Sequence, residues 1–311
     1  MRKYPKNQWL LVSTFVFLAT SFAHAQNFRV TLLGTGSPAM FRSGPSIFVV
    51  AGSQRLLFDC GRGTAQQLFR LKVPLAEIRT LFFTHLHSDH VVGFPDLWLN
   101  GWTPAGGSRT ERLRIWGPSG TREMASYLQK AYEFDIRVRG NDDERFSAEG
   151  IMVDALDITA GVVYDENGVL VTAFEVDHGP VKPAFGYRVD FAGRSVVLSG
   201  DTRFSENLIR ASEGADLVIH EVVAPDAFPM PHSEATKKII AHHTTPEQVG
   251  EVFSRVKPKL AVYSHISPGN VKVDDLIAST RKTYAGPLEV GADLMSFDVG
   301  EKIVIHRPPG P

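Results

Sequence analysis

Short apolar runs bounded by turn-forming residues recur along the chain, and they predict many short β-strands. The predicted strands are 28–33, 46–51, 55–58, 80–84, 113–116, 169–176, 185–190, 195–199, 217–220 and 260–264. Stretches with helical character lie between them, at 64–72, 121–131, 206–211, 245–256 and 274–284. This alternation predicts one α/β domain with two sheets.

Two local signals sharpen this picture. Asn167-Gly168 stands between two β-rich runs, which is a strong signal for a tight hairpin. The helix after residue 245 has the clearest start, because Thr245 can cap it, Pro246 suits its first turn and Gln248 completes a capping box.

The N-terminus has the three parts of a secretory signal peptide. Its first residues are basic, positions 9–23 are mostly apolar, and Ala23-His24-Ala25 resembles a cleavage site. An apolar run of about 15 residues is short for a membrane span of roughly 20. We therefore expect residues 1–25 to be removed, leaving residues 26–311 as a periplasmic or secreted domain without a stable membrane anchor.

Composition and charge are those of an ordinary globular protein, with 43% hydrophobic and 22% charged residues in 311. Loss of the signal peptide removes Arg2, Lys3 and Lys6 and lowers the formal net charge from −1 to −4. A slightly acidic chain without a lysine- or arginine-rich run argues against nucleic acid as a partner. Cys60 is the only cysteine, so stability must come from the core and from bound metal rather than from disulfides.

Metal-ligand side chains crowd the stretch that follows the predicted strand 80–84. Alternate residues of an extended segment point the same way, so His85 and His87 can share one metal ion. If a helix starts near Asp89, that residue and His90 diverge around its first turn and reach a second ion. Imidazole nitrogens and carboxylate oxygens suit a borderline-soft ion such as zinc.

Three more residues of ligand type follow apolar strands, where loops gather into sites. These residues are His178, Asp201 and His265. Each one alone is better explained as a structural histidine or a turn aspartate. Together with the stretch 85–90 they favour a metal centre.

The motifs "THLHSDH", "DHG", "SGDT" and "YSHIS", in this order, resemble the ligand motifs of the metallo-β-lactamase superfamily. The resemblance runs from about residue 28 to residue 306. "LLGTGSP", "IHE" at His220-Glu221 and "HHTT" at 242–245 resemble its ribonuclease Z and arylsulfatase-like branch.

This resemblance implies an α/β fold, a four-layer αβ/βα sandwich with two zinc ions at one edge; manganese or iron would also suit the ligands. It implies that one metal is held by His85, His87 and His178, the other by Asp89, His90 and His265, and that Asp201 bridges them. Asp59 would orient a ligand histidine, and Cys60 would be a packed neighbour.

The resemblance also implies the groups that act on the substrate. Glu221 would orient His243, and His243 would donate a proton to the departing oxygen. His242 is the rival for this role, because a shift of one residue in the motif exchanges the two. Asp89 joins these residues in the expected catalytic set as a metal ligand.

The expected activity is hydrolysis of small anionic esters by a metal-bridging hydroxide, with arylsulfatase-like sulfate-ester cleavage as the main prediction. Export argues against tRNA maturation, and so do the 22 residues between His178 and Asp201, too few for a tRNA-binding arm. A bridging Asp201 argues against dedicated β-lactam hydrolysis. The alternatives are a phosphodiesterase or ribonuclease Z-like nuclease, lactone or weak β-lactam hydrolysis, and a non-catalytic metal-binding scaffold. A homodimer is expected by analogy alone.

The segment 97–120 carries aromatic and basic side chains that are candidates for the substrate pocket. Trp98, Trp102 and Trp116 either line an apolar cleft or pack in the core. Five cationic residues either contact an anionic ester or lie on solvated surface: Arg109, Arg112, Arg114, Arg203 and Lys182.

Overall fold

The computed structural model describes residues 27–308 and Met1, so the predicted signal peptide and its cleavage site lie outside the described residues. Among those residues, no helix combines the length and the apolar character that a membrane span requires. Their strands form two mixed sheets, an eight-stranded sheet of order β15-β14-β1-β2-β3-β4-β5-β6 and a seven-stranded sheet of order β13-β12-β11-β10-β9-β8-β7.

The strands of the first sheet are β1 (Phe28–Gly34), β2 (Ser46–Ala51), β3 (Gln54–Phe58), β4 (Thr80–Phe82), β5 (Leu113–Gly117), β6 (Val153–Asp157), β14 (Ser296–Val299) and β15 (Ile303–His306). Those of the second are β7 (Gly161–Glu166), β8 (Val169–Glu175), β9 (Phe185–Phe191), β10 (Arg194–Leu198), β11 (Leu217–Val223), β12 (Leu260–Ser267) and β13 (Leu288–Val290). Each of the ten predicted strands overlaps one of these.

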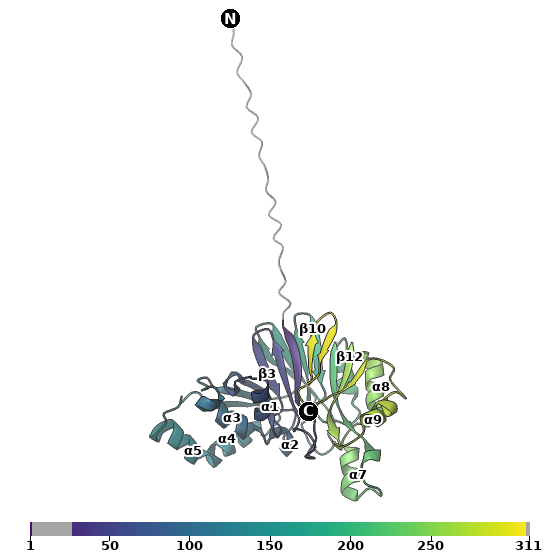
Figure 1. Ribbon diagram of the computed structural model, residues 1–311, viewed down its shortest axis with the longest axis horizontal. Helices are drawn as coiled ribbons and strands as arrows, with labels where there is room; N and C mark the ends of the chain where they lie inside the picture. Colours follow the sequence, from purple (N-terminus) through teal and green to yellow (C-terminus); the bar gives the residue numbers. More distant parts are fainter. Residues whose placement is uncertain (2–26, 309–311) are drawn as a thin grey trace.

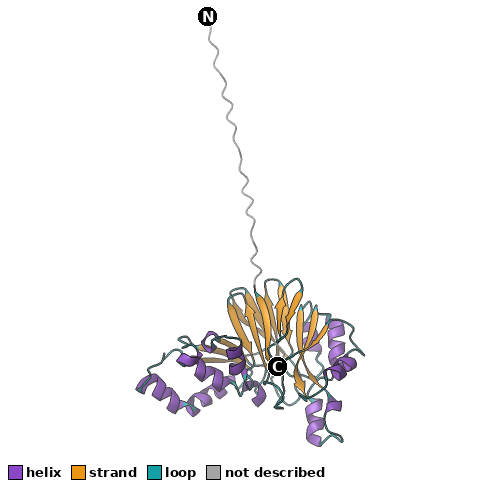
Figure 2. Cartoon of the chain, in the orientation of Figure 1, coloured by secondary structure: helices purple, strands orange, loops and turns teal. Residues whose placement is uncertain are grey.

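Helices cover the outer faces of both sheets (Figures 1 and 2). Their bounds are α1 (Thr64–Arg70), α2 (Ser88–Val91), α3 (Phe94–Trp102), α4 (Thr121–Ala131), α5 (Glu133–Arg137), α6 (Glu206–Ala211), α7 (Glu234–Ala241), α8 (Pro246–Val256) and α9 (Val273–Thr280). One apolar cluster fills the space between the sheets, a second lies under α1 and α3, and a third lies under α6, α8 and α9. Three apolar layers between four layers of structure make the αβ/βα sandwich that the resemblance implied.

Both local sequence signals are confirmed. Asn167 and Gly168 have φ angles of 53° and 77°, as a tight hairpin between β7 and β8 requires. The Thr245 side chain accepts from the Gln248 amide, and the Gln248 side chain accepts in return from the Thr245 amide, so the capping box of α8 is complete.

The strand directions define two ends of the sandwich. β3 and β4 are parallel, and so are β10, β11 and β12, so their carboxyl ends define one end of the molecule. β1 and β3 both run antiparallel to β2, so β1 starts at the opposite end and also runs toward this end. Asn27, just before β1, is therefore about 20 Å from the carboxyl ends, at 3.3 Å per strand residue.

Candidate metal centre

The stretch 85–90 leaves β4 in an extended conformation and then turns into a helix. His87 has extended backbone angles, φ −62° and ψ 145°, and caps α2, which starts at Ser88. Asp89 and His90 are therefore in the first turn of that helix, as the sequence predicted. The change from strand to helix is what aims the two pairs of ligand-type side chains in different directions.

The three remaining candidates reach the same end of the sandwich from other strands. His178 follows β8, Asp201 follows β10, and His265 lies within β12. The pairing of β11 with β12 shifts there, so that Ser264 and His265 together oppose Glu221 in a bulge. His265 has a φ of 44°, a left-handed conformation that costs energy in a residue other than glycine and is typical of functional sites.

The structure brings all seven predicted ligand residues together in two groups. Ligand atoms of His85, His87, His178 and Asp201 lie within 4.8 Å of one another, and so do those of the second group: Asp89, His90 and His265. In the first group, His178 Nε2 is 3.3 Å from His87 Nδ1. In the second, His265 Nε2 is 3.3 Å from Asp89 Oδ2.

Asp201 lies between the two groups. Its Oδ2 atom is 3.8 Å from His85 Nε2 and 3.9 Å from His178 Nε2 in one group. It is also 3.3 Å from His90 Nε2 and from His265 Nε2 in the other. A single carboxylate oxygen surrounded by four imidazoles has the position that a bridging ligand needs.

Buried atoms without hydrogen-bond partners show that these residues fit metal ions. Among the described residues, the unpartnered atoms include His85 Nε2, His90 Nε2 and Asp201 Oδ1. An unsatisfied buried polar atom costs about 1–3 kcal/mol, so several at one place indicate residues suited to binding a cation. A set of imidazoles and carboxylates suits zinc, and also manganese or iron.

The protonation states of two candidate ligands, His85 and His178, also fit a metal centre. Burial lowers the pKa of His85 well below its ordinary value and lowers that of His178 to about 4. Both rings are thus neutral at physiological pH, which is the form that binds a metal. Burial alone would raise the pKa of Asp201, but His265 and His90 outweigh it and hold this pKa well below its usual range.

Asp59 fixes the orientation of one ligand ring. His90 Nδ1 donates to Asp59 Oδ2 at 2.8 Å, which leaves His90 Nε2 facing Asp201. The Thr84 amide and hydroxyl donate to the same carboxylate, at 2.8 and 2.9 Å. Asp59 is therefore the carboxylate partner of a ligand histidine, as the resemblance implied.

Asp59→Asn should weaken metal binding by about 10- to 100-fold, the usual effect of losing such a partner. The new amide would keep the bond from Thr84, but its NH₂ would face His90 Nδ1. The ring would then carry its proton on Nε2, the atom that faces Asp201. Competition with a zinc-binding dye measures the affinity.

Asp216→Asn is the matched control for this substitution. Asp216 is also buried and also accepts a backbone amide, that of Ser195 at 2.8 Å, but it lies at the opposite end of β10 and β11. Equal affinity losses in both variants would mean that Asp59 acts only through folding.

Glu221 and His243 meet beside the second group of ligands. His243 Nδ1 forms an ion pair with Glu221 Oε1 at 3.2 Å, and Oε1 also accepts the amides of Thr202 and Thr244. The His243 ring stacks on that of His265, with centroids 5.6 Å apart. Burial lowers the pKa of His243, but the Glu221 carboxylate outweighs it and raises this pKa to about 9.

His243 is better placed than His242 to act at the centre. Ligand atoms of His243, Asp201 and His265 lie within 4.8 Å of one another and form a third group at the same centre. The sequence did not suggest His243 as a metal ligand. His242 ends α7, and its ring lies farther out, 6.1 Å from that of His178. Its carbonyl, rather than its ring, faces the centre and accepts from His178 Nδ1 at 3.1 Å.

The aromatic candidates for the pocket are core residues. Trp98, Trp102 and Trp116 are all buried, at 0%, 1% and 8% exposed. The first two lie in the apolar cluster under α3, and Trp116 stacks on Phe82 between the sheets. Of the two alternatives that the sequence left open for these tryptophans, core packing is therefore the correct one.

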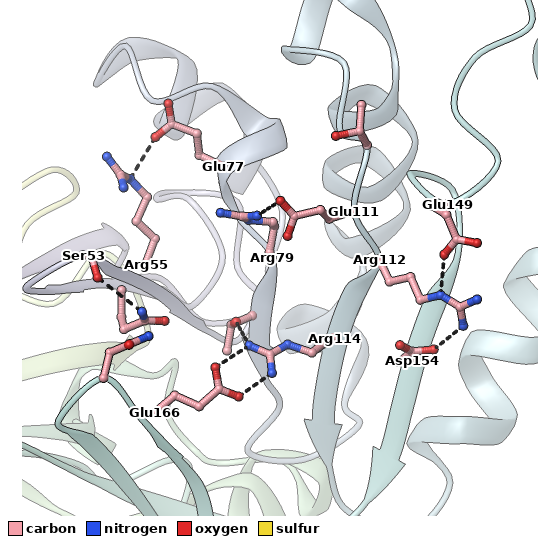
Figure 3. A pocket seen from close by; sticks show the side chains of 14 residues that line it. Ser53, Arg55, Glu77, Arg79, Glu111, Arg112, Arg114, Glu149, Asp154 and Glu166 are labelled. Atoms are coloured by element: carbon pink, nitrogen blue, oxygen red, sulfur yellow. Dashed lines mark hydrogen bonds and ion pairs between the residues drawn. The ribbon is translucent and has the colours of Figure 1, made fainter.

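Most of the cationic candidates also lie away from the centre. Arg109 is buried and donates to the carbonyls of Gly150 and Trp98. Arg112 and Arg114 line a cleft of about 730 Å³ near the β2–β3 turn, at the opposite end of the sandwich from the metal ligands (Figure 3). Both are paired with carboxylates there, the first with Glu149 and Asp154 and the second with Glu166.

Two threonines at the centre were missed by the sequence analysis. Thr202 and Thr244 each donate an amide to Glu221, and the Thr244 hydroxyl donates to the Thr202 carbonyl at 2.6 Å. They follow Asp201 and His243 directly, so their place within "SGDT" and "HHTT" was the available signal.

Comparison with known proteins shows the family and the fold. A family described as "Beta-lactamase superfamily domain" matches residues 54–266. The chain is 34% identical over 278 residues to a protein named ribonuclease Z from Mycolicibacterium gilvum (strain PYR-GCK), covering 87% of this chain and 96% of that one. It is 36% identical over 275 residues to the ribonuclease Z of Mycobacterium avium (strain 104), covering 87% and 98%.

Solved structures show the same fold. The short form of human tRNase Z aligns with a TM-score of 0.62 and 24% identity, over 88% of this chain and 99% of that one. The metallo-β-lactamase fold protein YhfI of Bacillus subtilis aligns with a TM-score of 0.68 and 19% identity, over 87% and 98%. With its fold, its cluster of histidines and aspartates and relatives of this similarity, the chain belongs to the metallo-β-lactamase superfamily, in the branch of the ribonucleases Z.

Proposed function

We propose that the chain is a phosphodiesterase that works with two zinc ions. The observation that carries the proposal is the position of Asp201 between two groups of ligands, within 4.8 Å of a ligand atom of His243. The main prediction, sulfate-ester hydrolysis, finds no support among the relatives compared. Their name, ribonuclease Z, supports the phosphodiester alternative instead.

Seven side chains would hold the ions. His85, His87 and His178 form one site, a second site is formed by Asp89, His90 and His265, and Asp201 is shared between the two. Two divalent cations bound there would lower the pKa of a water molecule and stabilise negative charge on the ester oxygens. The Glu221–His243 pair beside these ligands argues against the non-catalytic metal-binding scaffold, because a scaffold needs no proton donor.

His243 would supply the proton that the departing oxygen needs. A pKa of about 9 keeps the ring protonated at neutral pH, and Glu221 is the nearby carboxylate that favours this charge. Stacking on His265 holds the ring beside the ligands. The Glu221 carboxylate is itself held in place, because its Oε1 atom accepts the amides of Thr202 and Thr244.

The proposed substrates are nucleotide or RNA phosphodiesters, which reverses the argument against nucleic acid. That argument rested on net charge and on export, but a metal centre of this kind attracts an anionic ester locally whatever the net charge. The relatives' name supports RNA as the substrate class. The short segment between His178 and Asp201 is filled by β9 and β10, so a binding arm for tRNA would have to come from another part of the chain.

The first test compares matched esters on the purified, zinc-loaded enzyme. The nitrophenyl phosphodiester of thymidine should be hydrolysed with a kcat/KM at least about tenfold above that of nitrophenyl sulfate. A short single-stranded RNA tests the nucleic acid part of the proposal. Faster cleavage of the sulfate would contradict the proposal and favour the arylsulfatase prediction.

Export, dimer formation and the identity of the metal stay predictions.

A further inference from the structure

The segment that carries His243 receives little support from the helix before it. The segment 241–244 connects α7 to α8, and α7 has no buried residue. Figure 1 shows α7 projecting from the body of the molecule, below α8 and α9. Packing of α7 therefore does not fix the position of His243, and other contacts must do so.

These contacts come from the loops that carry the metal ligands. His178 Nδ1 donates to the carbonyl of His242 at 3.1 Å. The Thr244 hydroxyl donates to the carbonyl of Thr202 at 2.6 Å, and the Thr244 amide donates to Glu221 at 3.1 Å. The residues on both sides of His243 are thus tied to the centre.

Arg203 is the outermost of these ties. Its Nε atom donates to the carbonyl of Ala241 at 2.6 Å, at the C-terminal end of α7, where a positive charge also favours the helix dipole. Asp177 holds the arginine in turn, because its carbonyl accepts the Arg203 amide at 2.7 Å and its carboxylate lies 3.5 Å from the guanidinium. The arginine thus spans from the loop of His178 to the residue two positions before His243.

We propose that Arg203 is a positioning residue that holds His243 in place to protonate the leaving group. The inference rests on the proposed function, because it requires His243 to be the proton donor. Arg203 follows Asp201 by two residues, so it joins the proton donor to the loop of the shared ligand. Loss of this tie should displace the imidazole without removing any metal ligand.

The test uses two phosphodiesters that differ in their need for a proton. Hydrolysis of thymidylyl-thymidine releases a thymidine alkoxide, a poor leaving group that needs a proton. Hydrolysis of the nitrophenyl ester of thymidine phosphate releases nitrophenolate, which leaves without protonation. Arg203→Met should lower kcat on the dinucleotide by about tenfold or more, since small displacements of catalytic groups have large effects. The kcat on the nitrophenyl ester and the metal content should stay unchanged. Arg203→Lys, which can still donate to the Ala241 carbonyl, should recover part of the loss.

Two controls separate positioning from simple charge and from folding. Lys182 is exposed in the loop after His178 and has no described hydrogen bond to the segment 241–244, so Lys182→Met removes a positive charge from that loop without releasing the segment. It should have no selective effect on the dinucleotide. In the background of His243→Ala, Arg203→Met should cause no further loss on the dinucleotide, because the group that it positions is already absent.

Three outcomes would overturn the inference: equal losses of Arg203→Met on both esters, an equal effect of Lys182→Met, or full additivity in the double variant. If His243→Ala discriminates between the esters and Arg203→Met does not, only the role of Arg203 is wrong. If His243→Ala slows both esters equally, the proton donor of the proposed function is wrong, and the role of Arg203 is wrong with it.

Discussion

Asp201→Ala should abolish ester hydrolysis and leave the protein with less than two metal ions per chain. The expected loss in kcat/KM exceeds about 100-fold, because removing a residue that only hydrogen-bonds a metal ligand can already lower activity by up to about 100-fold. Without this carboxylate, the imidazoles of His85 and His178 in one group and of His90 and His265 in the other lose the negative charge that lies between the two groups. Elemental analysis of the purified variant, beside its rate, measures the effect.

Asp201→Asn refines this experiment, because it keeps the shape of the side chain and removes only the charge. Circular dichroism of both variants checks that the sandwich is folded. Two tightly bound ions in Asp201→Ala would contradict the shared position of this carboxylate. Normal metal content with lost activity would restrict Asp201 to a role in the reaction.

His243→Ala should slow thymidylyl-thymidine far more than the nitrophenyl ester. General acid catalysis typically contributes about 10²- to 10⁴-fold, and only the substrate with the poor leaving group depends on it. His242→Ala is the matched neighbour, because its ring lies outside the centre and its backbone carbonyl remains. The ratio of the two rates, measured for each variant, reports the proton transfer directly.

A larger selective loss in His242→Ala would reverse the assignment of the proton donor. Loss of metal in His243→Ala would have a different meaning. Ligand atoms of His243, Asp201 and His265 lie within 4.8 Å of one another. Loss of metal in His243→Ala would therefore indicate that His243 contributes to metal binding.

The sequence predicts the inner strands well because burial makes their apolar runs continuous. β4, β11 and β12 are buried along their whole length, so both faces read as apolar. β6 was missed because it is the edge of its sheet and alternates exposed and half-buried residues. α7 was missed for a related reason, since none of its residues is buried.

The candidate ligands could be proposed from the sequence because they follow strands whose ends gather at one end of an α/β sandwich, and the family resemblance implied their division into two groups. What decides their final geometry is not local. The bulge that turns His265 toward Asp201 depends on the register between β11 and β12, which no motif encodes. The choice between His242 and His243 depends on where α7 ends.

The side chains of the segment 97–120 show a second limit. Tryptophan and arginine suit both a pocket and a core, and only packing decides between them. Trp98 is covered by the body of the protein, and Arg109 is buried with its charge directed at the carbonyl of Trp98.

The direction of β1 has a practical consequence for work with this enzyme. Asn27 lies at the end of the sandwich opposite to the ligands, because β1 runs from there toward the centre. A purification tag or a linker to a solid support placed before Asn27 would thus leave the end with the metal-ligand residues facing the solution. Immobilisation through this terminus should leave large substrates, a folded RNA included, free to approach from solution.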